Sequence, residues 1–544
     1  MASTPTSKSQ VQAYRFEMKR RASALVRRDP VMLHDPMRTH VRAGIVGVSL
    51  ALVAVAGVFI FGFFKPKEAL PGTDSILVSS DSGAAFVLVH NPTRRLIPVT
   101  NLASARLILI KQAGAGAVGN AATAVPRKVK DDVLRDIPRE PLAGIPGAPT
   151  DIPQADELVD PEWSLCDTTA VDPSLPPGVQ LEPSRVEITS TAVIGLDKMG
   201  DELGPDQALL VRSAVDDRHY LVYQGKRAEV DLDDPAVTLA LNLSADQADR
   251  RPVSNGLLNA IPEVPALKPP DIPNADQPTS YRMGNNRVGA VVRTERAEGE
   301  KFYVLLTSGW QEITRSVANL IRAKSSNDIS IPGVPLQAIT DAREADADDK
   351  ISVDEYPADV PTVVPVREST LACLHWTFED GEQRTAITVA DGLTLPNGQR
   401  PVKLAQADGS GDLLDEVFLQ PGKGASVRGI VPDQPAGTGA IYLVTDLGTK
   451  FGVPGTAQVP SGELAAALGL GDFQPAPQAI LRLLPKGAAL DPSAIRAFDA
   501  VPVLAGAGVE LPQPGQPGAQ PVPPPEAGPE PGEEGDGTTQ EGGG

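Results

Sequence analysis

Hydrophobic positions along the chain fall into one long uninterrupted run, followed by several shorter runs that alternate with polar residues. The long run, residues 43–64, contains no charged side chain over 22 consecutive positions. A helix of that length rises about 33 Å, enough to cross the hydrocarbon core of a bilayer, so the run predicts one transmembrane helix. A cleaved signal peptide is the alternative. Its basic and apolar regions would be too long, and no A-x-A cleavage site follows Phe64.

A second, amphipathic helix is predicted before this run. Val11, Tyr14, Met18 and Leu25 recur at helical spacing, so that their side chains share one face. Two uses of this apolar face remain open. The helix either lies on the inner leaflet of the membrane or docks on a partner protein, and we prefer docking.

The distribution of charge predicts the orientation of the transmembrane helix. Residues 1–42 carry nine Lys and Arg side chains, with Arg38 and Arg42 closest to the apolar run, against three acidic ones. Only Lys65 and Lys67 flank the run on its other side. The positive-inside rule therefore places the N-terminus in the cytoplasm and the rest of the chain outside it. The total net charge of −20 and the arm's +6 leave −26 for that exported part, which argues against a surface that binds nucleic acid or anionic lipid.

Beyond the apolar run, four segments share the order strand, turn, strand, turn, strand, helix. They are residues 75–110, 208–243, 287–323 and 426–470. Each carries an aromatic residue in its middle strand, at Phe86, Tyr220, Phe302 or Tyr303, and Tyr442. An aromatic residue among β-branched and leucine neighbours is typical of a half-buried strand. We therefore expect an α+β fold with four β-β-β-α repeats, which pair with one another to complete their cores.

Proline-spaced stretches follow the repeats, starting at Ile137, Ile261, Ile331 and Leu483. Such spacing disfavours a helix and favours extended straps. Pro and Gly together make up 103 of the 544 residues, and aromatic residues only 4%. This composition indicates several small domains with extended connections rather than one large core.

The two cysteines of the chain lie in two segments outside the repeats. Cys166 stands in EWSLCD and Cys373 in LACLHWTF, so that each has a tryptophan three residues away. Export and the even number favour a disulfide that joins both segments into one central domain. Closing a loop of about 206 residues contributes on the order of 5 kcal/mol at most in the chain-entropy model. Two buried free thiols beside tryptophans are the alternative.

These patterns predict the following domain order. A cytoplasmic arm at 1–42 and a transmembrane helix at 43–64 precede repeat 1 at 70–150, the first part of the central domain at 151–204, repeat 2 at 205–275, repeat 3 at 276–345, the second part of the central domain at 346–412, repeat 4 at 413–510 and a Pro/Gly/Glu tail at 511–544. The tail has almost no apolar residues to bury, and we expect it to be disordered.

Motifs for catalysis are weak. The nearest approach to a phosphate-binding loop is Gly422-Lys423, but Val417 takes the place of the first glycine and Gly424 that of the hydroxyl residue. His375 is one candidate partner for a thiolate, yet its position two residues from a cysteine suits a residue that flanks a disulfide. The five histidines form no ligand cluster. We therefore predict no catalytic residue, no metal site and no cofactor.

The N-terminal arm resembles a known family. The segment QVQAYRFEMKRR, followed by ALVRRDPVMLHDP and one apolar run, resembles the start of EccB, a membrane component of the type VII (ESX) secretion system of actinobacteria. The resemblance implies one membrane span, four repeats of a phage-lysin-subunit-like fold and a central domain with a disulfide. It also implies a hexameric membrane assembly with EccC (the cytoplasmic motor ATPase), EccD and EccE as partners, and contacts with the mycosin protease. The tail is not carried over.

We expect the exported repeats to be a structural, scaffolding part of such an assembly, with homo-oligomeric contacts. A cell-wall-binding module is one alternative, because lysin-type repeats bind envelope polymers and Trp310 on a turn could stack on a sugar ring or belong to the core. An ATPase is the other, since members of the family carry that label, and ATP is implied by the label alone. Hydrolysis outside the cytoplasmic membrane would lack a supply of ATP.

Overall fold

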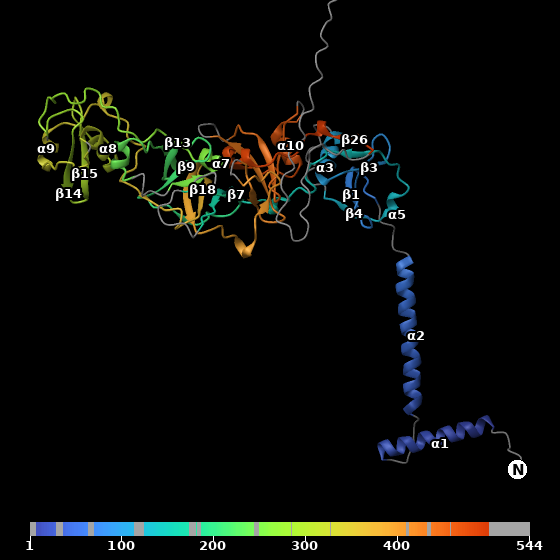
Figure 1. Cartoon of the computed structure of the whole chain (residues 1–544). Helices are drawn as coiled ribbons and strands as arrows, with labels where there is room; N and C mark the ends of the chain where they lie inside the picture. Colours follow the sequence, from blue (N-terminus) through green and yellow to red (C-terminus); the bar gives the residue numbers. More distant parts are fainter. Residues whose placement is uncertain are drawn as a thin grey trace, which may run out of the picture. The chain divides into compact units, whose positions relative to one another are not determined.

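The computed structural model describes most of the chain up to residue 499. The described residues are 7–28, 36–63, 70–113, 125–172, 181, 186–243, 250–283, 285–326, 328–409, 413–431, 437–456 and 459–499. They form an N-terminal part that ends at Pro71 and a second part that begins at Gly72 (Figure 1). The predicted tail, residues 511–544, and the flanking residues Lys65 and Lys67 lie outside the described residues.

Helix α1 (Lys8–Arg27) opens the N-terminal part. It starts at a capping box, in which the Ser7 hydroxyl accepts from the Gln10 N–H and the Gln10 side chain accepts from the Ser7 N–H. No residue of this helix is buried in the described part of the chain. Its apolar face is therefore left open to an outside partner or lipid.

Helix α2 (Pro36–Phe63) carries the long apolar run. Its segment Val41–Phe61 is long and apolar enough to cross a membrane. The helix begins at Pro36, before the charge-free run, because proline is well suited to the first position of a helix. The prediction of one membrane-length helix near the N-terminus is confirmed at this level.

Sheets I and IV have the same topology. Sheet I contains β1 (Ser75–Ser79), β2 (Ala85–Val89), β3 (Arg95–Pro98) and β4 (Arg127–Val129), with α3 (Leu102–Ala113) before β4. Sheet IV contains β22 (Gly424–Ile430), β23 (Ile441–Thr445), β24 (Lys450–Gly452) and β25 (Gln474–Pro477), with α10 (Ser461–Ala467) before β25. In each, three strands run antiparallel and the strand after the helix pairs parallel to the first, in the orders β3-β2-β1-β4 and β24-β23-β22-β25.

Sheets II and III begin in the same way. Sheet II contains β9 (Gln207–Ser213), β10 (His219–Tyr223), β11 (Lys226–Glu229), β12 (Arg251–Val253) and β13 (Glu263–Val264), with α6 (Pro235–Ala240) before β12 and β17 (Thr362–Val363) also paired to β9. Sheet III contains β14 (Val291–Arg296), β15 (Gly299–Leu305) and β16 (Trp310–Ile313), followed by α8 (Arg315–Ser326). The middle-strand aromatics Phe86, Tyr220, Phe302 and Tyr303 are buried.

A second, short helix and a returning segment complete each sheet. The helices are α5 (Asp131–Leu134), α7 (Asn255–Ala260), α9 (Leu336–Asp341) and α11 (Gln478–Leu483). The segment after each helix pairs parallel with the third strand, at Leu96 with Arg139, Arg227 with Glu263, Trp310 with Glu344, and Lys450 with Lys486. The expected β-β-β-α pattern is thus only the first half of what each sheet contains.

The proline-spaced stretches are therefore bonded to sheets instead of forming free straps. The carbonyl oxygens of Pro138, Pro262 and Pro485 accept from the third strands of sheets I, II and IV. The stretch at Ile331 differs, because Pro332 accepts from Arg293 in the first strand of sheet III and α9 follows it. Proline has no N–H to donate, but its carbonyl oxygen can still accept a hydrogen bond from a strand at the edge of a sheet.

The central sheet joins two distant segments of the chain. It contains β6 (Trp163–Thr169), β7 (Ile188–Ile194), β8 (Asp201–Glu202), β18 (Leu371–Glu379), β19 (Glu382–Ala390), β20 (Val402–Lys403) and β21 (Glu416–Phe418), in the order β20-β21-β7-β6-β18-β19-β8. The remaining short elements are β5 (Leu142–Gly144), which pairs with β26 (Arg496–Phe498), and the 3-10 turns Ala155–Glu157, Ala347–Asp349, Pro396–Gly398 and Pro492–Ala494.

Helices on the sheets form the contacts between them. Side chains of sheets I and IV with α3 and α10 share one core. Sheets II and III meet through α6 and α8, and sheets II and IV through α7 and α11, whose core also includes the central sheet. The expectation that the sheets complete one another's cores agrees with these shared clusters.

The α3–α10 and α6–α8 contacts contain the same kind of hydrogen bond, from a side chain of one helix to a carbonyl oxygen at the end of the other. Arg106, the fifth residue of α3, donates through Nη1 to the Leu468 carbonyl oxygen at the end of α10. Asn319, the fifth residue of α8, donates through Nδ2 to the Ala240 carbonyl oxygen at the end of α6. Carbonyls in the last turn of a helix lack intrahelical partners, which explains why both contacts form there. Sheets I and IV therefore pair in the same way as sheets III and II.

Candidate functional site

The predicted docking residues lie together on the open face of α1. The exposed fractions are 39% for Val11, 65% for Tyr14, 50% for Met18 and 83% for Leu25. Arg42 is exposed on α2, and Arg38 lies in the first turn of that helix. Several large apolar side chains exposed on one helical face are typical of a surface that binds protein or lipid.

The two cysteines form a disulfide at the middle of the central sheet. Cys166 on β6 lies directly opposite Cys373 on β18, and both are buried beneath Met199 and Leu393. The bond expected from the sequence is present, and it joins the two segments on either side of sheets II and III.

His375 occupies the next position on the same face of the sheet. It lies opposite Ser164, and the Ser164 Oγ and His375 Nδ1 atoms are 2.9 Å apart. Burial lowers the pKa of His375, which favours the neutral ring. Ser164 is fully buried, so that this pair is a hydrogen bond inside the sheet rather than an accessible nucleophile with its base.

A buried carboxylate that the sequence analysis missed lies beside the disulfide. Asp167 is fully buried on β6 and accepts hydrogen bonds from Ser190 and Ser254. Burial is the main cause that raises the pKa of Asp167 to about 6. The signal in the sequence is small: one aspartate between SLC and TT in a strand that is otherwise apolar or hydroxylic.

The Gly422-Lys423 turn does not form a phosphate cradle in the described structure. The Gly422 N–H donates to Asp446 Oδ2 at 2.9 Å, and Lys423 Nζ donates to the Asp156 carbonyl oxygen at 2.7 Å. The turn leads into β22, whereas a phosphate-binding loop opens a helix whose first amides point at the phosphate. The amide and ammonium groups that a nucleotide would need are therefore already bound within the protein.

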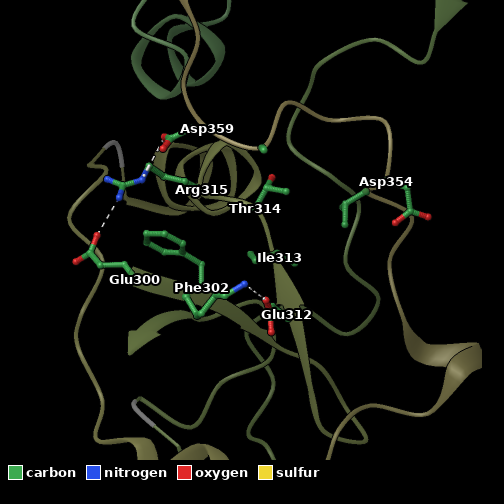
Figure 2. A pocket seen from close by; sticks show the side chains of 11 residues that line it. Glu300, Phe302, Glu312, Ile313, Thr314, Arg315, Asp354 and Asp359 are labelled. Atoms are coloured by element: carbon green, nitrogen blue, oxygen red, sulfur yellow. Dashed lines mark hydrogen bonds and ion pairs between the residues drawn. The ribbon is translucent and has the colours of Figure 1, made fainter. Parts of the chain in front are cut away.

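A pocket of about 470 Å³ opens on sheet III (Figure 2). Phe302 and Arg315 are among the residues that line it, and the Arg315 guanidinium lies 5.1 Å from the centroid of the Phe302 ring. Arg315 forms ion pairs with Glu300 at 3.0 Å and Asp359 at 3.2 Å. Arg315 is thus paired on both sides, and the two ion pairs hold the start of α8 to the sheet and to the loop at Asp359.

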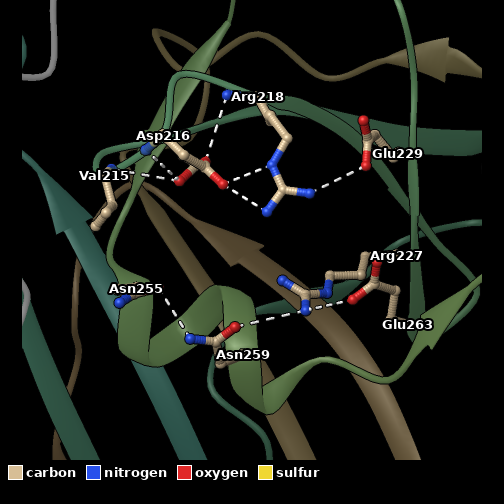
Figure 3. Close-up of polar contacts among 9 residues, drawn as sticks. Val215, Asp216, Arg218, Arg227, Glu229, Asn255, Asn259 and Glu263 are labelled. Carbon is tan, nitrogen blue, oxygen red and sulfur yellow. Dashed lines mark hydrogen bonds and ion pairs between the residues drawn. The ribbon is translucent and has the colours of Figure 1, made fainter.

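A comparable network lies on sheet II (Figure 3). Arg218 bridges Asp216 and Glu229, while Arg227 pairs with Glu263 at 2.8 Å. The Tyr220 ring contacts both guanidinium groups, at 5.7 Å and 5.1 Å from its centroid. This arrangement fixes the returning strand β13 to β11, which is a structural role.

Trp310 serves the packing of α9. Its indole N–H donates to the carbonyl oxygens of Ile339 at 3.1 Å and Ala342 at 2.9 Å, and its ring meets Tyr303 edge to face. A tryptophan that stacks on a sugar needs an open ring face, and this one is half-buried. Among the described residues, no group of three or more His, Cys, Asp or Glu side chains is placed to hold a metal ion.

The chain is similar to known proteins over most of its length. The sequence matches the family described as "Type VII secretion system ESX-1, transport TM domain B" over residues 3–503. It is 33% identical over 506 residues to the ESX-3 secretion system ATPase EccB3 of Mycolicibacterium smegmatis, with 91% of each chain covered. It is 31% identical over 498 residues to the ESX-5 secretion system ATPase EccB5 of Mycobacterium marinum, covering 89% of this chain and 92% of that protein.

Solved structures show the same fold. A chain of the intact ESX-5 inner membrane complex matches with a TM-score of 0.65 and 27% identity, over 94% of this chain and 99% of that one. A chain of the EccB3 dimer from the ESX-3 core complex matches with a TM-score of 0.62 and 29% identity, over 77% and 99%. One of these similar chains thus comes from an inner membrane complex, and the other from a dimer within a core complex.

Proposed function

Because the chain belongs to the EccB family of the type VII (ESX) secretion system, we propose that it is a scaffolding subunit of an ESX inner-membrane complex. The observation that carries this proposal is the combination of one apolar helix with sheets that share cores through their helices. Packing of this kind suits a rigid body that holds other subunits in place. The sheets would form the outer part of the assembly.

The proposed orientation has the N-terminus in the cytoplasm. The basic arm before α2 supports it through the positive-inside rule, and the Cys166–Cys373 disulfide supports exposure of the second part to an oxidising compartment. In this arrangement the domain boundaries expected from the sequence separate a cytoplasmic arm, a span and an extracytoplasmic body.

The proposed partners are homologues of EccC, EccD and EccE, the mycosin protease, and further copies of this chain. The solved EccB3 dimer supports contacts between copies. The exposed stripe of Val11, Tyr14, Met18 and Leu25 supports docking of α1 on a partner in the cytoplasm.

An ATPase is the second candidate, because the names of the relatives carry that word. The bonding of Gly422 to Asp446 and of Lys423 to Asp156 favours the scaffold over it. A cell-wall-binding module is the third, and the engaged indole N–H of Trp310 gives it little support.

Disruption of the α1 stripe tests the proposal. We expect a Tyr14→Ala/Met18→Ala double variant to insert normally, since α2 is unchanged, but to lose the large assembly on native gels of solubilised membranes. Phe16→Ala is the matched control, because Phe16 is also large, apolar and exposed but lies off the stripe. Equal assembly in the double variant, Phe16→Ala and wild type at equal protein level would show that α1 does not dock the subunit.

A further inference from the structure

The connection from β7 to β8 crosses one face of the central sheet. These two strands stand third and seventh in the sheet, so that β6, β18 and β19 lie between them. At about 4.8 Å per strand the gap is about 19 Å. The chain from Ile194 to Asp201 spans about 23 Å at most, so it must run nearly straight. The β18–β19 hairpin extends past this crossing to Glu379 and Glu382, which closes the way around the end of the sheet. We call residues 195–200 the cover loop.

The cover loop meets the sheet at the disulfide. Met199 packs against the cluster that contains Cys166, Cys373 and Leu371. The Met199 carbonyl oxygen accepts from the Thr388 hydroxyl, and Thr388 lies directly opposite Cys373 in the β18–β19 pair. The two cysteines are 0% and 1% exposed. One side chain and one hydrogen bond of the cover loop therefore help to close the disulfide off from solvent.

Both ends of the cover loop are fixed against the protein. Gly195 and Gly200 have φ angles of 73° and 82°, in the left-handed region that favours glycine. A Cβ atom would lie 2.5 Å from Val159 Cβ at the first position and 2.4 Å from the Val389 carbonyl oxygen at the second. Between these ends no residue of the loop is fully buried. The middle of the loop can therefore lift while its ends remain in place.

The other surroundings of the disulfide are held more firmly. Leu393, which follows β19, also packs against the cysteines. Its neighbour Leu395 is buried in one cluster with Val193 and Phe418, to which the cover loop adds only partly buried side chains. The opposite face of the sheet is closed by the core that it shares with sheets II and IV. The cover loop is thus the part that can open with the loss of the fewest buried contacts.

We propose that the cover loop is a gate for the redox chemistry of the Cys166–Cys373 disulfide: a dithiol reductant reaches the sulfur atoms only while the loop is lifted, and the rest of the body stays folded. The inference goes beyond the proposed function and does not depend on it. A thiolate of the dithiol attacks one cysteine sulfur, breaks the S–S bond and releases the other cysteine as a thiolate. The second thiol then resolves the mixed disulfide, so that the dithiol loses two electrons and two protons and both cysteines become thiols.

Reduction of the folded full chain in detergent by dithiothreitol tests this inference. The chain has two cysteines, so that alkylation followed by mass measurement counts the reduced molecules directly. We expect the rate of reduction to be nearly independent of urea below the unfolding transition, because lifting a short loop exposes little surface. A rate that rises exponentially with urea, with the slope of global unfolding, would overturn the inference.

Two variants test the cover loop itself at constant pH. Thr388→Val removes the donor to the Met199 carbonyl, and we expect reduction to become about fivefold faster. Met199→Ala removes the side chain packed on the cysteines and should make it about tenfold faster. Thr385→Val is the matched control, because Thr385 on β19 also donates to a backbone carbonyl, that of Gly225, but from the opposite face of the sheet.

The control variant should be reduced at the wild-type rate. Equal rates in Thr388→Val, Thr385→Val and wild type would show that the cover loop does not control access to the disulfide. A wild-type rate as fast as that of a disulfide in a short unfolded peptide would show that the bond is already open to the reductant, and it would overturn the inference as well.

Discussion

Replacement of Arg106 separates packing from charge at the contact between sheets I and IV. The Arg106 side chain is 3% exposed, and its Nη1 atom is 2.5 Å from the Leu468 carbonyl oxygen. Arg106→Ala leaves that carbonyl without a partner, at about 1–3 kcal/mol, and removes a buried stem worth about 0.8 kcal/mol per CH₂. Burial disfavours the charged guanidinium and lowers the pKa of Arg106. Because Arg106→Ala also removes this buried charge, part of the loss in stability is offset.

The expected net loss for Arg106→Ala is about 2–3 kcal/mol of local stability, because two unfavourable changes outweigh one favourable change. Arg106→Met keeps most of the stem and removes both the charge and the hydrogen bond, so we expect a loss below about 1 kcal/mol. Lys111→Ala, an exposed position on the same helix, should change nothing measurable.

Native-state hydrogen exchange can measure these differences where they arise. A loss of 2–3 kcal/mol accelerates amide exchange by about 30- to 150-fold, and we expect that acceleration in peptides from α3 and α10. Peptides from α6 and α8 should be unchanged, since their contact is made by Asn319 and Ala240. Unchanged exchange in α3 and α10 of Arg106→Ala would refute this reasoning, and equal acceleration in all four helices would refute the independence of the two contacts.

Three further predictions concern other features of the same chain. Asn319→Ala should accelerate exchange in α6 and α8 and leave α3 and α10 unchanged, the converse of Arg106→Ala, and a uniform change would contradict the equivalence of the two contacts. A peptide map of membrane-derived protein should show Cys166 cross-linked to Cys373, whereas alkylation of both thiols before reduction would disprove the bond in vivo. Purified chain should hydrolyse ATP no faster than Lys423→Ala, because Lys423 is bound to the Asp156 carbonyl; turnover that disappears with Lys423 would establish a nucleotide site.

Local patterns in the sequence were enough to predict the antiparallel core of each sheet. Phe86, Tyr220 and Tyr303 stand in short runs of strand-forming residues, and each run is buried at four consecutive positions, as expected of a middle strand that is covered on both faces. The membrane-length helix was also predictable, because an uninterrupted apolar stretch of this length is typical of a transmembrane helix. Both features depend on residues close together in the chain.

Features built from distant residues were not predictable. Helices such as α5 and α7 have only four to six residues, too few for a helical period to stand out. The returning segments pair with strands about 35 to 45 residues away, as Leu96 does with Arg139, and only proline spacing marks them. The hydrogen bonds of Asp167 need Ser190 and Ser254, which no local pattern relates to it.

The α7–α11 contact indicates where the array of sheets stops. At the second position of α7 stands Gly256, where a Cβ atom would lie 3.0 Å from Leu483 Cδ1, and α11 has the small Ala479 at its second position. The second positions of α5 and α9 are Asp132 and Gln337, both exposed and polar. Terminal members of stacked arrays need such a polar outer face. Helices α5 and α9 thus lack the small residue that lets α7 and α11 approach closely, so that this close contact joins sheets II and IV and is not offered in the same form by sheets I and III.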